Sequence, residues 1–515
     1  VLFGGANAYL GLRVGMTVSA SIPAAVISMG VIRIILRKDS VLENNMVQTI
    51  GSAGESLAAG AIFTMPVLFM WAAEGKRTMP GLGEIALICI CGGALGVFFM
   101  IPLRSALIVQ EHGVLPYPEG TACAEVLLAG EKGGAKAGTV FAGLGIAAVY
   151  KFIADGLRVF PSEVDFEVKS YKGAGIGIDV LPALLGVGYI CGMRVASYLL
   201  AGGVTAWFVI MPVIALFGGD AVLYPATVPI SELGAWGIWS HYIRYIGAGA
   251  VAAGGIFSLI KALPLIIRTF AQAVRGYGKN MEEESRTAQD IPIRVVLVGI
   301  LITAIVMWLI PVIPVNLPGA ILIVVLGFFF ATVSSRMVGL VGSSNNPVSG
   351  MAIATLIITA AIYKSSGASA EGMVSSIAVG TIICIIAAMA GDTSQDLKTG
   401  YIVGATPKKQ QYGELISVVV SSMAIGGILY LLNAAWGYGS SELPAPQATL
   451  MKMVVEGVYS AKAALKLAEK YHVTMPIVEQ VNEVLFDGKS AKDALAELML
   501  RDKRMENTSL IWDKE

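Results

Sequence analysis

The sequence predicts an all-α membrane protein: a polytopic bundle of about 12–13 transmembrane helices, some re-entrant or broken, followed by a short soluble helical tail. Three observations predict this class. Of 515 residues, 56% are hydrophobic and 14% are charged, whereas a soluble domain carries about 25% charged residues. Apolar stretches of the roughly 20 residues that a spanning helix needs recur along most of the chain. Polar segments rich in glycine interrupt several of them.

We expect spans, in chain order, at residues 15–36, 49–71, 84–103, 139–157, 175–199, 202–217, 242–267, 293–310, 317–333, 343–363, 373–390 and 413–432. Residues 1–12 have the composition of one more helix. Since the chain begins with Val1 inside apolar sequence, we expect an N-terminus cut within a first helix. Residues 104–138 are mixed in polarity, which is typical of a re-entrant pair or a broken helix.

Lysine and arginine indicate the orientation, because cytoplasmic loops are enriched in both. The loops 268–294 and 398–412 carry several of them, whereas the loops 218–240 and 433–449 carry none. Alternate threading places both basic loops on the cytoplasmic face. Basic residues in the first half of the chain, among them Lys76, fall on the opposite face. One explanation is that a span in this half is miscounted. The predicted location is the cytoplasmic (inner) membrane.

A carboxylate lies inside the second predicted span. Glu55 stands between Gly54 and Ser56, and a charge at membrane depth costs about 2.5–3.5 kcal/mol on insertion scales. Such a residue normally faces a cavity or a partner and marks a transport path. The alternative is a glutamate that snorkels to the surface, because Glu55 lies about two turns into the span.

Four polar segments interrupt the apolar sequence: residues 43–56, 115–127, 342–350 and 391–400. Each combines glycine or proline with carboxylates, amides or hydroxyls, and broken helices at membrane depth occur only beside protein or a water-filled cavity. Asp392 and Asp396, four residues apart, would share one helical face and could hold an amine, a cation or a proton. The alternative is a set of ordinary loops and caps, in which Asp392 begins a helix.

A weak internal repeat relates two of these segments. Residues 46–52 (MVQTIGS) match residues 337–343 (MVGLVGS), which aligns Glu55 with Asn346. Repeats of this kind are typical of transporters built from two related halves. Chance similarity between apolar spans is the alternative. The five cysteines and three histidines show no metal-ligand spacing, so we expect neither a metal site nor a cofactor.

The segments together resemble the oligopeptide transporter (OPT) family, close to its bacterial members and related to the yellow-stripe-like branch. The matching sequences are NAYLGLRVGMTVSASIPAAVIS, ENNMVQTIGSAGESLAAG, LPYPEGTACAEVL, SSRMVGLVGSSNNPVSGM, DTSQDLKTGYIVGATPKKQQ and LPAPQATLMK, which fall within residues 1–458. The resemblance implies symport of protons with small peptides or metal chelates. Within the motifs we expect proton coupling at Glu55 and Glu119 and substrate contact at Tyr117, Asn345, Asn346, Asp392, Gln395 and Asp396.

The tail, residues 459–515, differs from the rest because no stretch in it approaches 18 apolar residues. Residues 453–506 resemble the C-terminal end of NAD-dependent glycerol-3-phosphate dehydrogenase. No glycine-rich dinucleotide turn precedes them, so we expect no NAD binding and no enzyme activity. We interpret the chain as a chimera of a transporter domain, residues 1–458, truncated at both ends, and a foreign tail. A regulatory tail of the same pattern is the alternative.

We therefore predict a proton-coupled secondary transporter for small oligopeptides. Transport of metal chelates through the same fold is the first alternative, and a membrane-anchored dehydrogenase or a passive channel are others. The expected partners are the substrate, protons and the lipid bilayer. Assembly into a homo-oligomer stays open, and nothing predicts binding to nucleic acid, because the net charge is zero.

Overall fold

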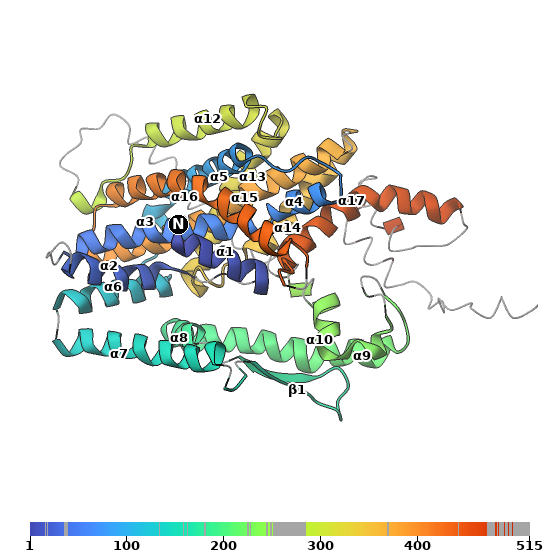
Figure 1. Ribbon diagram of the computed structural model, residues 1–515, viewed down its shortest axis with the longest axis horizontal. Helices are drawn as coiled ribbons and strands as arrows, with labels where there is room; N and C mark the ends of the chain where they lie inside the picture. Colours follow the sequence, from blue (N-terminus) through green and yellow to red (C-terminus); the bar gives the residue numbers. More distant parts are fainter. Residues whose placement is uncertain are drawn as a thin grey trace, which may run out of the picture.

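The computed structural model describes residues 1–250 and 285–470, apart from 35–39 and scattered single or paired positions, and a few positions between 479 and 497. Helices make up most of it (Figure 1). Eight helical stretches in the described part are long and apolar enough to cross a membrane. The chain is a multi-pass, all-α membrane protein, as the composition predicts.

The first half contains α1 (Leu2–Val14), α2 (Ser21–Ile34), α3 (Val41–Ile62), α4 (Pro66–Ala73), α5 (Leu82–Arg104), the π-helix η1 (Ser105–Gln110), α6 (Pro118–Lys132), α7 (Gly134–Lys151), the π-helix η2 (Phe152–Gly156), β1 (Glu163–Glu167), β2 (Gly175–Asp179), α8 (Pro182–Val204), the π-helix η3 (Thr205–Ile210) and α9 (Met211–Gly218). Within residues 104–138 the structure has η1, which continues α5, then a turn, α6 and the first residues of α7.

The second half contains the 3-10 helix η4 (Ile230–Glu232), α10 (Gly234–Ile238), the π-helix η5 (Trp239–Ile243), the 3-10 helix η6 (Arg286–Ala288), α12 (Ile293–Leu309), α13 (Leu317–Val341), α14 (Val348–Ser365), α15 (Ala370–Val403), α16 (Pro407–Trp436) and α17 (Pro446–Lys470). The predicted span 242–267 lies mostly outside the described residues, as does most of the tail.

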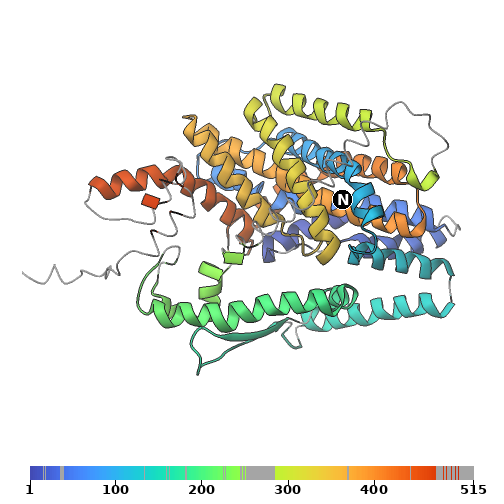
Figure 2. The same ribbon diagram turned by 180° about the vertical axis from the view of Figure 1, so that it is seen from behind.

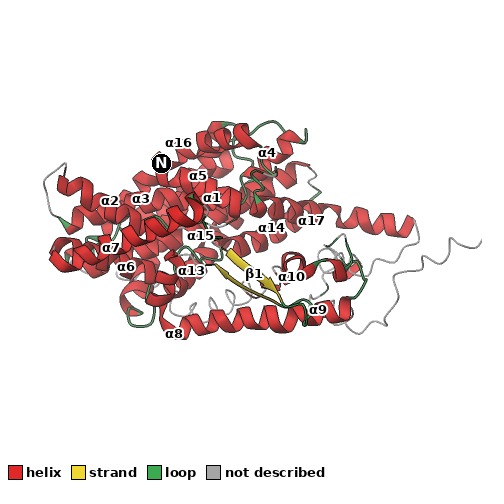
Figure 3. Ribbon diagram, turned by 60° about the horizontal axis from the view of Figure 1, so that its bottom comes forward, coloured by secondary structure: helices red, strands yellow, loops and turns green. Residues whose placement is uncertain are grey.

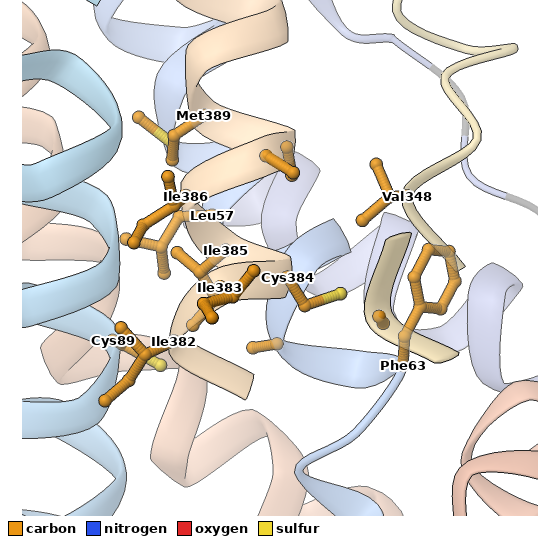
Figure 4. Packing of buried hydrophobic residues seen from close by; sticks show 14 of the residues in the cluster. Leu57, Phe63, Cys89, Val348, Ile382, Ile383, Cys384, Ile385, Ile386 and Met389 are labelled. Atoms are coloured by element: carbon orange, nitrogen blue, oxygen red, sulfur yellow. The ribbon is translucent and has the colours of Figure 1, made fainter. Parts of the chain in front are cut away.

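The centre of the bundle is α15, which packs against α3, α5, α13 and α14 (Figures 1 and 2). Its residues Ile382 to Ile386 are fully buried, and Figure 4 shows them beside Leu57 and Cys89. Glycines allow the close approach: a Cβ at Gly60 would lie 2.6 Å from the Ile385 Cα, and one at Gly96 would lie 2.6 Å from the Met389 Cβ. Small residues serve this purpose widely between membrane helices.

Two predicted boundaries were wrong. The first five residues of the predicted span 175–199 form β2, which pairs antiparallel with β1 and lies near α10 (Figure 3). The predicted break at 200–201 is also absent, because α8, η3 and α9 follow one another without interruption from Pro182 to Gly218. Two glycines weaken a helix in water, but in lipid a break would expose unpaired backbone groups at a larger cost.

The polar segments differ in their backbone conformation. Residues 43–56 lie wholly inside α3 and residues 391–400 wholly inside α15, so neither breaks its helix. Residues 342–347, by contrast, form an irregular loop between α13 and α14. The repeat is therefore not matched in local structure, because one copy is continuous helix and the other is a helix end followed by this loop.

The helix α17 crosses the predicted end of the transporter domain at Val458 without interruption. Its first half docks on the body of the protein. Glu456 accepts hydrogen bonds from the Trp71 Nε1 at 2.9 Å and from the Lys76 Nζ at 2.7 Å, and Lys452 pairs with Glu74 at 2.6 Å.

Candidate functional site

A small cavity lies where α3, α15, the 342–347 loop and the segment before α2 meet. It is lined by Thr17, Ser19, Glu55, Ser56, Ala59, Phe63, Ser343, Ser344, Asn346, Val348 and Ala388. Its volume is about 20 Å³, which is room for one water molecule and no more. Figure 4 shows two of its apolar lining residues, Phe63 and Val348, close to the buried core of α15.

Glu55 lines this cavity and is 3% exposed. Its carboxylate accepts hydrogen bonds from the Asn7 Nδ2 on α1 and from the backbone N–H of Ala20 at 3.2 Å. A side chain that snorkels to water would have neither contact. The structure therefore places Glu55 inside the bundle, where three segments converge on it.

Asp392 and Asp396 both face α3, one helical turn apart. The Ser52 hydroxyl donates to Asp392 at 2.6 Å, and Ser52 also bonds with the Ser21 hydroxyl at 2.7 Å. The Gln48 side-chain amide donates to Asp396. Because Asp392 lies in the interior of α15, the alternative in which it caps a helix is wrong.

Glu119, near the start of α6, holds the 342–347 loop. Its carboxylate accepts from the backbone N–H groups of Ser343 at 2.8 Å and Ser344 at 3.1 Å, and from the Ser343 hydroxyl. Gly342 has a φ of +87°, and a Cβ there would lie 2.8 Å from the Glu119 Oε1. Glycine is therefore required where the loop turns around the carboxylate.

The other predicted residues lie at different distances from the cavity. Asn346 lines it and donates to the Ser334 hydroxyl at 2.8 Å. Gln395 joins α6 to α13, because it accepts from the Gly120 N–H at 2.6 Å and donates to the Val338 carbonyl at 3.1 Å. Tyr117 is fully buried with a φ of +46°. Asn345 is exposed, and its side-chain amide donates a hydrogen bond to the backbone carbonyl of Val341 at the end of α13.

Sequence reasoning missed a fifth buried carboxylate. Glu414, on α16, is 0% exposed and accepts from the Thr393 hydroxyl at 3.0 Å. The signal was present, because Glu414 is a carboxylate at the start of the predicted span 413–432. The helix begins at Pro407, six residues earlier than the span, which brings Glu414 into the bundle. Gln48 and Asn7 were also missed as partners of the acids.

These five carboxylates have no cationic partner. Within the described residues, no ion pair joins Glu55, Glu119, Asp392, Asp396 or Glu414 to a lysine, arginine or histidine. One oxygen each of Asp392, Asp396 and Glu414 also lacks any hydrogen-bond partner there. The described part holds no group of three or more metal-type ligands. Since an unpaired buried charge is very costly, Asp392, Asp396 and Glu414 together lack the compensation that three ionised carboxylates would need.

The buried lysine of α15 does not neutralise them. Lys398 bonds with the His112 Nδ1 at 2.8 Å and donates to the Leu115 carbonyl at 3.2 Å. Burial and the Lys398 charge both lower the pKa of His112, which keeps its ring nitrogen free to accept this bond. Lys398 therefore stabilises the turn between η1 and α6, and its ammonium group does not compensate the charge of the five carboxylates.

Comparison with known proteins gives two kinds of match. The sequence model described as OPT oligopeptide transporter protein matches residues 1–475. A Haemophilus influenzae protein named as an oligopeptide transporter is 33% identical over 496 residues, covering 88% of this chain and 76% of that protein. A rice (Oryza sativa subsp. japonica) protein named as a metal-nicotianamine transporter, YSL13, is 23% identical over 500 residues, covering 86% and 67%.

The second kind of match is short. A glycerol-3-phosphate dehydrogenase of Agathobacter rectalis is 68% identical over 62 residues, which is 12% of this chain and 18% of that enzyme. A similar enzyme of Fusobacterium nucleatum is 61% identical over 56 residues. Both resemblances expected from the sequence are thus confirmed, and the dehydrogenase match covers less than a fifth of either enzyme.

Proposed function

The chain belongs to the OPT oligopeptide transporter family, and from that premise we propose that it carries small oligopeptides across the cytoplasmic membrane together with protons. The family establishes transport across a membrane. The substrate and the driving ion are our proposal. It is supported above all by one observation, the five buried carboxylates without cationic partners, one of which, Glu55, lines the cavity.

The charge of this cluster supports proton coupling. An ionised carboxylate taken out of water costs several kcal/mol even after the protein relaxes. Since no lysine or arginine offsets that cost here, a site of this kind takes up protons, the cationic amine of a substrate, or both. Glu55 is the proposed proton acceptor because it borders the cavity directly. Its neutral and ionised forms would bind a cationic group with different affinities, which is the requirement for coupling.

The polar lining supports a peptide as the substrate. Asp392, one turn of α15 from the cavity-lining Ala388, would attract the peptide amine, and Asp396 lies one turn beyond it. Asn346 offers an amide to the peptide backbone. The first turn of α14, which begins beside the cavity at Val348, suits the peptide carboxylate, because helix N-termini favour anions. Tyr117 and Gln395 would position these elements.

The size of the cavity implies a conformational change. A space of about 20 Å³ holds a water molecule but no peptide, so the 342–347 loop must move for a substrate to enter. Glu119 is the proposed link between protons and that movement. Its carboxylate binds the loop through three donors, and protonation would weaken all three bonds.

Uptake into proteoliposomes tests this function. The full chain is reconstituted in lipid vesicles, and accumulation of labelled tri-alanine and other short peptides is followed with an inward proton gradient. We expect accumulation that a protonophore abolishes. Equal flux with and without the protonophore would indicate a passive channel and contradict the proposal, as would the absence of flux for every peptide tested.

Metal chelates are the second candidate substrate, favoured by relatives named as metal-nicotianamine transporters. Competition separates the two. Peptide uptake that is insensitive to added metal–nicotianamine complex supports peptides, whereas efficient inhibition together with metal accumulation supports chelates.

We also propose that the residues after Val458 come from a second protein and add no enzyme activity. The short, highly identical dehydrogenase match supports this origin. Long-read sequencing of single DNA molecules from the source, across the codons for Thr449 to Ser460, tests it. Reads that never span the join would support an assembly artefact, and frequent spanning reads would support a real fusion. NADH oxidation by the purified protein would contradict the absence of enzyme activity.

A further inference from the structure

The cavity has an acidic end and an apolar end, and the antiparallel packing of α3 against α15 produces the difference. Ser52 donates to Asp392 at 2.6 Å. Roughly two turns further along α3, a Cβ at Gly60 would lie 2.6 Å from the Cα of Ile385. The end of α3 therefore lies against the earlier part of α15, and acidic residues give way to apolar ones in the same direction along both helices.

Four of the residues that line the cavity form its apolar end. Ala59 and Phe63 lie one and two turns beyond Glu55 on α3, and Ala388 lies on α15 between the two contacts just described. Val348, the first residue of α14, also lines the cavity, and Figure 4 shows it beside Phe63. All four side chains are buried, so this end offers a surface without charge.

Two small residues and one large one determine the room at the apolar end. Ala59 and Ala388 each carry a single methyl group, and the close contact of Gly60 with Ile385 prevents the two helices from leaving more space beneath them. Phe63 is the largest side chain that lines the cavity, and it lies about 12 Å along α3 from Glu55. Its ring therefore limits the length of any group that enters from the acidic end.

This arrangement should persist when the cavity opens. The acidic and apolar residues of α3 and α15 lie on continuous helices, whereas the part proposed to move is the irregular 342–347 loop. Movement of the loop would add volume without changing the order of polar and apolar groups along the two helices.

A peptide matches this order, because its amine and its first side chain are bonded to the same carbon atom. With the amine at the acidic end, near Glu55 and Asp392, the first side chain extends towards the apolar end. A charged side chain would lose its hydration there without gaining a partner.

We propose that the apolar end receives the side chain of the substrate's N-terminal residue, that peptides with a small apolar first residue are the favoured substrates, and that Phe63 sets the upper limit of its size. Apolar walls with a few polar groups at one end are typical of sites for small molecules. This inference rests on the proposed peptide transport, to which it adds a substrate class and a specificity-determining residue.

Competition between peptides tests the specificity. Vesicles that contain the full chain accumulate labelled tri-alanine under an inward proton gradient, and unlabelled Val-Ala-Ala, Phe-Ala-Ala or Lys-Ala-Ala is added. We expect Val-Ala-Ala to inhibit about as well as unlabelled tri-alanine, and the other two to inhibit about tenfold less well. In Phe63→Ala, inhibition by Phe-Ala-Ala relative to tri-alanine should improve about tenfold. This ratio does not depend on how much of the protein is folded.

Further variants separate the pocket from general effects. Ala388→Val reduces the room and should weaken inhibition by Val-Ala-Ala relative to tri-alanine. If Phe63→Ala fails to fold, Phe63→Leu should change the ratio in the same direction. Phe69→Leu, a buried phenylalanine of α4 that does not line the cavity, should leave it unchanged.

Two results would overturn the inference while peptide transport stands: ratios that are the same in the Phe63 and Ala388 variants as in the unmodified protein, or a preference of the unmodified protein for Lys-Ala-Ala. The absence of uptake and competition for every peptide in the unmodified protein would reject the proposed function itself, and this inference with it.

Discussion

The Glu119 carboxylate lies 2.8 Å from the backbone nitrogen of Ser343 and also accepts from the Ser343 hydroxyl, so a residue of α6 determines the conformation of the loop between α13 and α14. The two residues are 224 positions apart in the chain. Because Ser343 lines the cavity and Glu119 does not, this contact transmits any change at Glu119 to the cavity wall.

Glu119→Gln should release that loop. The amide nitrogen of glutamine cannot accept the donors that the second carboxylate oxygen accepts, so at least one backbone N–H loses its partner. We expect a loss of about 1–3 kcal/mol in stability and at least a tenfold drop in uptake rate. Thermal unfolding in detergent and vesicle uptake measure the two effects. Glu125→Gln, an exposed position on the same helix, is the matched control, and equal behaviour of both variants would remove Glu119 from this role.

Glu55→Gln should separate coupling from binding. The substitution keeps the shape of the side chain but removes its titration, so we expect gradient-driven accumulation to be abolished. Exchange of labelled for unlabelled peptide across the membrane, which needs no net proton movement, should be partly retained. Counterflow in vesicles without a pH gradient measures it. Equal loss of both activities would argue against proton coupling at Glu55.

Gly96→Val should destabilise the bundle. The added side chain would enter the space occupied by Met389, since a Cβ at this position lies 2.6 Å from the Met389 Cβ. Overpacking of a dense core costs about 1–3 kcal/mol. We expect a lower thermal unfolding temperature, followed by circular dichroism. Gly427→Val, a glycine whose added Cβ would meet no atom within 4 Å, should change it little. Similar shifts for both would indicate a helix-propensity effect.

Stability should fall in acid through the contacts of Glu74. Hydrogen bonds from Lys452 and then Lys76 lower the pKa of Glu74 below its ordinary value of 4.5. Since the folded-state pKa is below the unfolded one, the stabilisation is present above the unfolded value and is lost as pH falls through the folded value. The Glu74 side chain is 38% exposed, so solvent screening limits the effect to about 0–1 kcal/mol.

The measurement compares unfolding temperatures of the unmodified protein and Glu74→Gln as a function of pH. Their difference should be constant near neutrality and vanish at strongly acidic pH. A difference that persists in acid would show that Glu74 contributes through packing, and Glu371→Gln should show no difference at any pH.

Sequence patterns predicted the bundle because lipid allows few alternatives to a helix. Hydropathy located α5, α12 and the apolar half of α15 closely. It could not predict that polar residues 391–400 continue α15, because their partners come from α3, α6 and α16, far away in sequence. A polar segment looks like a loop until the hydrogen bonds that satisfy it are known.

The candidate site was predictable in its parts but not in its assembly. Glu55 and Asp392 were identified because carboxylates are rare in apolar sequence. Glu414 was missed because the predicted span began at residue 413, which made it resemble a surface residue. Asn345 has the same residue type as Asn346 and directly precedes it, yet the turn of the loop directs one into solvent and the other to the cavity.

The uninterrupted course of α17 has a practical use in imaging. This helix docks on α4 and α14 through its first half and continues as a single helix to Lys470. Its 25 residues correspond to a length of about 37 Å. A compact marker protein joined in helical register at Lys470 would therefore keep a fixed orientation and could serve to align particle images of the protein.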